Sequence, residues 1–128
     1  MKAARDHRDH LDDISQAAQK ALDFVRGMVY QDFLVDDKTA FAVVRALEIL
    51  GEATKRIPQE VRDLAPQVPW RSMAGIRDKL IHDYVSVDLE VVWRTVTEDL
   101  PPLVPMIQRV IEQMAEADTG PCHAGGQA

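Results

Sequence analysis

The chain has 128 residues, of which 46% are hydrophobic and 28% are charged, and its formal net charge is −6. This composition is typical of one globular domain, and the single cysteine, Cys122, excludes a disulfide framework. The acidic balance argues against a general nucleic-acid binder, although a local basic cleft is still compatible with it.

The N-terminal sequence MKAARDHRDH contains no apolar stretch of the kind found in signal peptides. No apolar run approaches the ~20 residues that are needed to span a bilayer. Together with the lone cysteine, these features lead us to expect a cytoplasmic protein without a membrane partner.

Residues from about 8 to 29 are predicted to form an amphipathic helix. Their apolar residues recur at spacings of three and four, which gives one stripe for burial. The stripe consists of Leu11, Ile14, Ala18, Ala21, Leu22, Val25 and Val29.

A second helix is predicted over residues 39–57, with Asp36 or Asp37 as its N-cap. It stops before Pro58 and is apolar around much of its circumference, as expected of a central helix. Gly51 within it costs ~1 kcal/mol relative to alanine, and the close approach of another helix backbone would compensate for that cost.

Residues 58–69 contain three prolines and are predicted to form a short helical turn and a loop. A further helix is predicted over about residues 69–82, with a proline at its start. We expect this helix to loosen between His82 and Ser86.

The most regular pattern follows, as a heptad-like seam of apolar residues in steps of four and three. We expect three prolines to kink or split this helix, because proline lacks a backbone donor. The seam comprises Leu89, Trp93, Val96, Leu100, Leu103, Ile107, Val110 and Met114, and the prolines are Pro101, Pro102 and Pro105.

No strand and no internal repeat is evident, so the predicted fold class is all-α, an up-and-down bundle of four to five helices. Residues 1–118 are assigned to this domain. The Gly-rich residues 119–128 are predicted to form a disordered C-terminal tail.

Arg77 and His82, within IRDKLIHDYV, are the candidate catalytic residues. Cutting RNA without a metal needs a base for the ribose 2′-OH proton, and histidine titrates near neutral pH. It also needs a fixed positive charge beside the phosphate oxygens, which suits arginine. On one straight helix the two side chains would point about 140° apart, so a shared site requires a distorted helix or a second copy in a two-fold dimer.

A structural interpretation of the same residues stays open. A lone histidine near a helix end often has only a structural role, and Arg77 could pair with Asp78 or Asp83. Tyr84 would then be a half-buried aromatic residue with its hydroxyl in water. Spacing alone does not decide between the two interpretations.

The segment RDKLIHDY, Arg77 to Tyr84, resembles the R-x4-H-x-Y motif of the HepT-like proteins, toxin ribonucleases of the HEPN superfamily. The blocks RALEILGEATKRIP, PWRSMAGIRDKLIHDY and SVDLEVVWRTVTEDLPPL are similar to recurring blocks of that family, in the same order. The resemblance covers roughly residues 8–116.

This resemblance implies a HEPN-like homodimer in which Arg77 and His82 line a cleft between protomers and cut RNA without a metal or another cofactor. Asp78 stands at a position where the superfamily prefers a polar residue. The implied partner is an MntA-like nucleotidyltransferase, the antitoxin of a type VII toxin–antitoxin system, which transfers AMP to Tyr84. DNA is not an expected partner.

Two further residues are candidates for a supporting role at this site. Lys79 adds local positive potential, and Glu52 lies in the block LGEA, which recurs in the family. Glu48 and Glu52, one helical turn apart, could also be paired catalytic carboxylates. Alternatively they are ion-paired surface residues, with Arg45, Lys55 and Arg56 as partners.

Other residue groups also have two interpretations. Asp6, His7 and His10 could be metal ligands, but a fraying terminus without a fourth ligand favours solvated charges. Trp70 and Trp93 could stack on bases, but core or dimer anchors are more usual.

Two functions from other classes remain as alternatives to the ribonuclease. One is a non-catalytic module that binds a nucleotide or presents a substrate to a minimal nucleotidyltransferase. The other is a purely structural helical dimer without a ligand.

Overall fold

The computed structural model describes residues 6–83 and 86–127, with side chains described as far as Ala117. Within this part of the chain the protein is helical, and an isolated antiparallel bridge joins Ile81 to Val87, so the all-α prediction is confirmed. The elements are α1 (His7–Phe24), α2 (Tyr30–Leu34), α3 (Asp37–Lys55), α4 (Gln59–Asp63), α5 (Trp70–Ala74), α6 (Ile76–Leu80), α7 (Leu89–Arg94), the π-helical turn η1 (Thr95–Asp99) and α8 (Leu100–Gln127).

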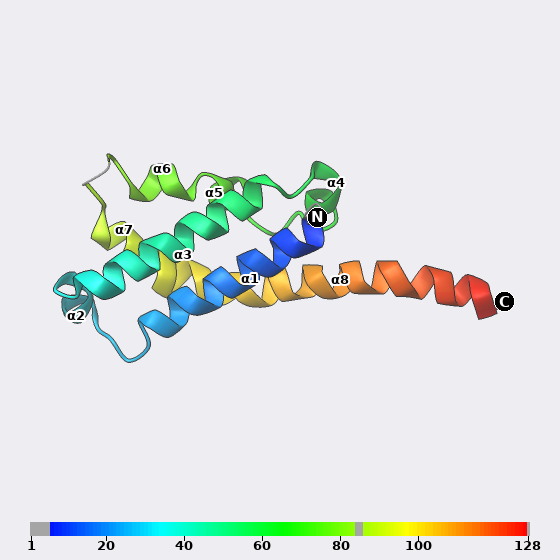
Figure 1. The fold of residues 1–128 in the computed structure, drawn as a ribbon, viewed down its shortest axis with the longest axis horizontal. Helices are drawn as coiled ribbons and strands as arrows, with labels where there is room; N and C mark the ends of the chain where they lie inside the picture. Colours follow the sequence, from blue (N-terminus) through cyan, green and yellow to red (C-terminus); the bar gives the residue numbers. More distant parts are fainter. Residues whose placement is uncertain (1–5, 84–85, 128) are drawn as a thin grey trace, which may run out of the picture.

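The long helices form the body of the bundle. α1 packs against both α3 and α8, while α5 and α6 run along another side of α3 (Figure 1). α8 continues well past the other helices (Figure 1). The division into a domain of residues 1–118 and a tail stays a prediction. In the described part of the chain, no helix combines the length and the apolar character needed to cross a membrane.

The boundaries of α1 follow from its caps. The Asp6 carboxylate accepts the backbone N–H groups of Arg8 at 2.9 Å and Asp9 at 3.2 Å, and such bonds lower the pKa of Asp6. The helix ends at Phe24 and not near residue 29 as predicted, because the chain turns at Gly27, whose φ is +78°. Most of the apolar stripe as far as Val25 is buried as predicted, with Leu22 partly buried, while Val29 is 57% exposed.

The short helix α2 lies between the two helices that were predicted over residues 8–29 and 39–57. Its Phe33 is fully buried and packs against Trp93, with 5.3 Å between ring centroids. A five-residue helix is too short to show a clear apolar period in the sequence. The packing of Phe33 on the rest of the protein stabilises this helix instead.

The predicted N-cap of α3 is confirmed. Asp36 accepts the Thr39 backbone N–H at 3.0 Å and the Thr39 hydroxyl at 2.7 Å, and these bonds lower the pKa of Asp36. At the other end of the helix, the Arg62 guanidinium donates to the carbonyls of Thr54 and Ile57 at 3.0 and 3.1 Å. A cation there satisfies carbonyls that the helix leaves unpaired.

Gly51 allows α3 to approach the junction of α5 and α6 closely. A Cβ atom at this position would lie 2.8 Å from Cγ2 of Ile76 and 3.3 Å from the carbonyl oxygen of Met73. The expected close backbone approach is therefore present. The single helix predicted over residues 69–82 is in fact two, since the chain breaks at Gly75.

The prolines near residue 100 do not split the last helix. The chain stays helical from α7 through η1 into α8, and the π-helical turn lies directly before Pro101 and Pro102. Its wider turn relieves the clash of a proline ring with a preceding carbonyl. The seam forms one wall of the core, with Val96, Leu100 and Ile107 at most 1% exposed.

Candidate functional site

The chain leaves the helical conformation inside the candidate motif. α6 ends at Leu80, and Ile81 is extended with φ −117° and ψ 116°. Two backbone bonds then close a tight loop: the His82 N–H donates to the Ser86 carbonyl at 2.8 Å, and the Asp88 N–H donates to the Leu80 carbonyl at 2.9 Å. Among the described residues, the helix has ended before His82, in line with the predicted loosening, and the separation of about 140° expected on an ideal helix no longer applies.

His82 is exposed at the start of this loop. The Asp83 carboxylate accepts a hydrogen bond from the Ser86 N–H at 2.7 Å, which stabilises the loop locally. Tyr84, the predicted site of modification, lies outside the described residues.

Arg77 projects from α6 toward α3. Its Nε lies 3.4 Å from Oε2 of Glu48, with side-chain exposures of 61% for Arg77 and 26% for Glu48. The acidic partner therefore comes from the central helix, not from the neighbouring acids Asp78 and Asp83.

A groove of about 560 Å³ lies between α3 and the motif segment, and both Arg77 and Glu48 line it. Arg45 and Asp37 add one charge of each sign, and the remaining lining is apolar. The apolar lining residues are Ala40, Phe41, Val44, Ile81, Val87 and Leu89. The groove thus combines a hydrophobic wall with two guanidinium groups and two carboxylates, although His82 is not among the described residues that line it.

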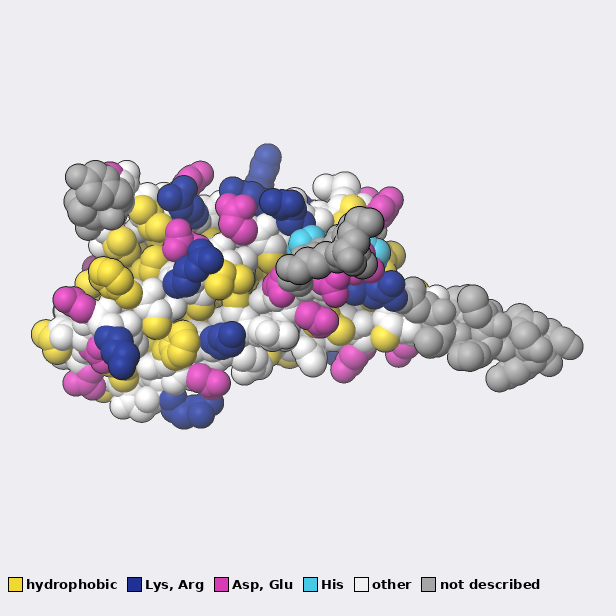
Figure 2. All heavy atoms as spheres, in the orientation of Figure 1, with side chains coloured by type: hydrophobic (Ala, Val, Ile, Leu, Met, Phe, Trp, Pro, Cys, Tyr) yellow, Lys and Arg dark blue, Asp and Glu magenta, His cyan; other side chains and the backbone are white. Residues whose placement is uncertain are grey.

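The outward side of α3 and the residues just before it carry apolar side chains that the protomer leaves uncovered, among charged ones such as Lys38 and Arg45. Phe41 is 78% exposed and Val35, just before α3, is 84% exposed. Figure 2 shows hydrophobic side chains gathered over this end of the molecule, where α2, α3 and α7 meet. Apolar residues around much of its circumference led us to expect a central helix, and α3 does pack on several helices, but one side of it faces outward.

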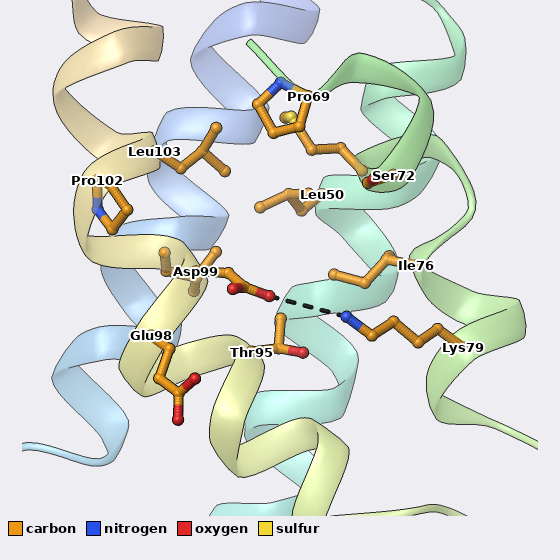
Figure 3. Close-up of a pocket in the computed structure, with 12 residues that line it drawn as sticks. Leu50, Pro69, Ser72, Ile76, Lys79, Thr95, Glu98, Asp99, Pro102 and Leu103 are labelled. Carbon is orange, nitrogen blue, oxygen red and sulfur yellow. Dashed lines mark ion pairs between the residues drawn. The ribbon is translucent and has the colours of Figure 1, made fainter. Parts of the chain in front are cut away.

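Lys79 lies on a different side of α6 from Arg77. Its Nζ is 3.8 Å from Oδ2 of Asp99, and both side chains are more than half exposed (Figure 3). The pair sits at a second pocket of about 340 Å³ between α5, α6 and the η1–α8 segment, which Leu50 and Ile76 also line. The two basic residues of α6 therefore face separate pockets.

The other predicted supporting residues lie apart from the groove's lining. Glu52 is exposed and pairs with Lys55 on its own helix, with 3.3 Å between Oε1 and Nζ. Asp78 is exposed on α6. Sequence reasoning missed Glu48 as the partner of Arg77, and the available signal was a carboxylate flanked by the apolar residues Leu47 and Ile49.

The tryptophans and the N-terminal acid have structural roles. Trp70 is buried and donates its indole N–H to the Ala65 carbonyl at 3.0 Å, and Trp93 packs on Tyr30 and Phe33. Asp6 caps α1. In the part of the chain that the structure describes, no three His, Cys, Asp or Glu side chains gather closely enough to hold a metal ion.

Comparison with known proteins gives the same family as the motif. The family model described as "Ribonuclease HepT-like" matches residues 14–110. The "Probable ribonuclease HepT" of Thermococcus cleftensis is 54% identical over 99 residues, covering 77% of this chain and 90% of that protein. No solved structure matches the chain significantly.

Two more distant relatives extend the match over more of the chain. A "Putative RNase" of Methanocaldococcus jannaschii is 39% identical, covering 89% of this chain and 94% of its own length. A "Putative RNase" of Caldanaerobacter subterraneus is 37% identical, covering 88% of this chain and 98% of its own length. The helical bundle, the motif on α6 and these matches together show that the chain belongs to the HepT-like ribonuclease family of the HEPN superfamily.

Proposed function

We propose that the protein is a metal-independent endoribonuclease and the toxin of a type VII toxin–antitoxin pair, acting as a homodimer. The observation that carries the proposal is the setting of the motif. Arg77 lines a groove, and the helix ends between it and His82, so an exposed imidazole follows on a short loop. The names of the relatives, which describe ribonucleases, support the same reaction class.

In the proposed reaction the ribose 2′-oxygen attacks the neighbouring phosphorus. The His82 imidazole accepts the 2′-OH proton as the bond from that oxygen to phosphorus forms. The bond from phosphorus to the 5′-oxygen breaks, and this oxygen takes up a proton from water. The products are a 2′,3′-cyclic phosphate and a 5′-hydroxyl, and Arg77 stabilises the negative charge on the phosphate oxygens.

The homodimer accounts for the uncovered apolar face. Residues such as Phe41 and Val35 would be costly to leave in water, and a contiguous apolar surface is typical of an interaction site. In a two-fold dimer built on this side, each protomer would contribute Arg77 and His82 to one cleft.

The proposed antitoxin is an MntA-like nucleotidyltransferase that adds AMP to Tyr84. A phosphodiester and an adenosine two residues from His82 would place negative charge and bulk where the RNA phosphate must bind. Cleavage would stop because the modified site is occupied.

The direct test is cleavage of cellular RNA by the purified protein in EDTA. We expect the wild type to cut, and the single variants R77A and H82A to cut at least ~100-fold more slowly, since each removes one of the two catalytic groups. Product ends, read by end-labelling, should carry 2′,3′-cyclic phosphate.

Two matched substitutions control for nonspecific effects. R26A removes an exposed arginine paired with Asp23 at the end of α1, and H10A removes a histidine beside Asp13. Both should cleave like the wild type. A wild type that cuts nothing, or R77A and H82A variants that cut equally well, would refute the nuclease. Nucleotide binding without any cleavage would instead support the non-catalytic partner of a nucleotidyltransferase.

A further inference from the structure

We infer that Glu48 is a positioning residue, which holds the Arg77 guanidinium in the orientation needed for cleavage. This inference rests on the proposed function, because it assigns a role in the same reaction. It starts from the ion pair of 3.4 Å between Arg77 Nε and Glu48 Oε2, which joins two separate helices across the floor of the groove.

The helix that carries Glu48 is a rigid support. Glu48 lies within the 19-residue helix α3, whose inner side, including Leu47 and Leu50, is fully buried. Three residues further along, Gly51 lets the start of α6 sit directly on α3. This packing fixes the distance between the backbones of α3 and α6. The Glu48 carboxylate therefore keeps a constant position relative to α6.

The difference in side-chain exposure indicates that Glu48 orients Arg77, and not the reverse. Glu48 is 26% exposed, so the surrounding groove limits its side-chain rotamers, whereas Arg77 is 61% exposed and has a long flexible stem. Without the carboxylate, the guanidinium would be free to sample many orientations in solvent. With it, the arginine is ordered before the substrate arrives, which is the pre-organisation that charge stabilisation requires.

The chemistry of the guanidinium makes this arrangement useful. Arginine has five N–H donors, one on Nε and four on the two terminal nitrogens. A carboxylate close to Nε leaves the terminal nitrogens able to donate two parallel bonds to a phosphate. The same carboxylate also places a negative charge near the RNA backbone, so it orders the arginine at some cost in substrate affinity.

These two effects predict a distinctive kinetic pattern. E48A should lower kcat on a short RNA by about 10- to 100-fold, because a misplaced catalytic group costs rate. Its KM should stay the same or fall, since a negative charge is removed from the groove. E48Q should keep most of the rate, because its amide oxygen can accept a hydrogen bond from Arg77 Nε, and its KM should also fall. A purely structural role would not split kcat from KM in this way.

The matched control is Glu90, which forms another Glu–Arg pair with Arg94, 4.0 Å apart on α7, and is not among the groove's lining residues. E90A should leave kcat and KM unchanged. A second measurement needs no catalysis: the Nε–H signal of Arg77 in ¹⁵N NMR, assigned by its absence in R77A. Its exchange with water should be faster in E48A than in the wild type, and unchanged in E90A.

Each outcome decides the matter. Reduced kcat without raised KM in E48A, together with faster exchange at Arg77, supports the positioning role. If the wild type cleaves RNA but E48A cleaves as fast, or if exchange at Arg77 is unchanged, Glu48 does not position the arginine, while the ribonuclease itself stands. If the wild type does not cleave RNA, the proposed function fails and this inference fails with it.

Discussion

The backbone at Ile81 decides how the motif residues are presented. Ile81 is extended and bridges to Val87, so the helix that carries Arg77 has ended before His82. The two residues can then be placed independently: Arg77 is set by the packing of α6 on α3, and His82 is set by the loop. If the helix had continued regularly to His82, the side chains of Arg77 and His82 would have pointed about 140° apart.

Tyr84 gives a prediction at the level of a single residue. Co-expression with the MntA-like nucleotidyltransferase should add AMP to the wild type, and the adduct should abolish cleavage by adding charge and bulk beside His82. The variant Y84F lacks the acceptor oxygen, so it should cleave RNA in the presence of the enzyme. Intact-mass spectrometry and the cleavage assay measure the two effects. AMP on Y84F, or full cleavage by the modified wild type, would count against this form of control.

At the level of elements, the position of α6 depends on Gly51. An added Cβ would meet a side-chain carbon of Ile76 at 2.8 Å and a backbone oxygen of Met73 at 3.3 Å. The backbone cannot retreat without moving the start of α6, and Arg77 is the next residue after Ile76. Packing at one glycine is therefore coupled to the geometry of the groove.

The variant G51A tests this coupling. Overpacking should cost about 1–3 kcal/mol of stability, partly offset by the ~1 kcal/mol helix propensity that alanine gains. Cleavage should fall further than stability alone explains, because Arg77 moves with α6. Thermal unfolding and single-turnover cleavage measure the two effects.

G75A is the matched control for this variant. Its new Cβ would lie 3.5 Å from the Arg71 carbonyl oxygen, an ordinary contact. G75A should therefore stay close to the wild type in stability and rate. A G51A protein that is as stable and active as the wild type would show that the close approach has no consequence.

Helix content could be predicted from the sequence where the apolar period is long. Most residues of the two predicted stripes are buried, although Leu22, Leu89, Trp93 and Met114 are only partly buried and Val29 is exposed. Asp36 caps α3 as predicted. Short elements could not be predicted, because α2 depends on the tertiary contact of Phe33 with Trp93. The breaks at Gly27 and Gly75 required backbone conformations that a periodic pattern does not encode.

The candidate site was predictable only in part for a related reason. Arg77 and His82 could be chosen as candidates from their residue types and from the resemblance of RDKLIHDY to the R-x4-H-x-Y motif, since their spacing alone does not decide. Glu48 lies 29 positions before Arg77, and only the folded packing of α3 on α6 brings them together. Local patterns contain no information on such a contact, so the pair became visible only in three dimensions.

At the level of the whole molecule, charge and apolar surface point to a confined site. The chain has a net charge of −6, which disfavours broad adsorption of RNA. The groove lining carries Arg45 and Arg77, balanced by Asp37 and Glu48, beside exposed apolar side chains. In the proposed dimer, joining two such faces would bury the apolar residues and bring the arginines of both protomers into one cleft, which would confine the contact with RNA on an acidic protein.

The central claim is that Arg77 and His82 of paired subunits act on the same phosphodiester, and a mixed dimer of R77A and H82A tests it most directly. The two inactive variants are unfolded together, refolded at equal amounts, and assayed on RNA in EDTA, with mixed dimers verified by native mass spectrometry. Half of the dimers are mixed, and each mixed dimer keeps one of the two Arg–His pairs that a wild-type dimer has across the two-fold axis. About a quarter of wild-type activity should therefore return. Mixed dimers that form but do not cleave RNA would contradict the shared site.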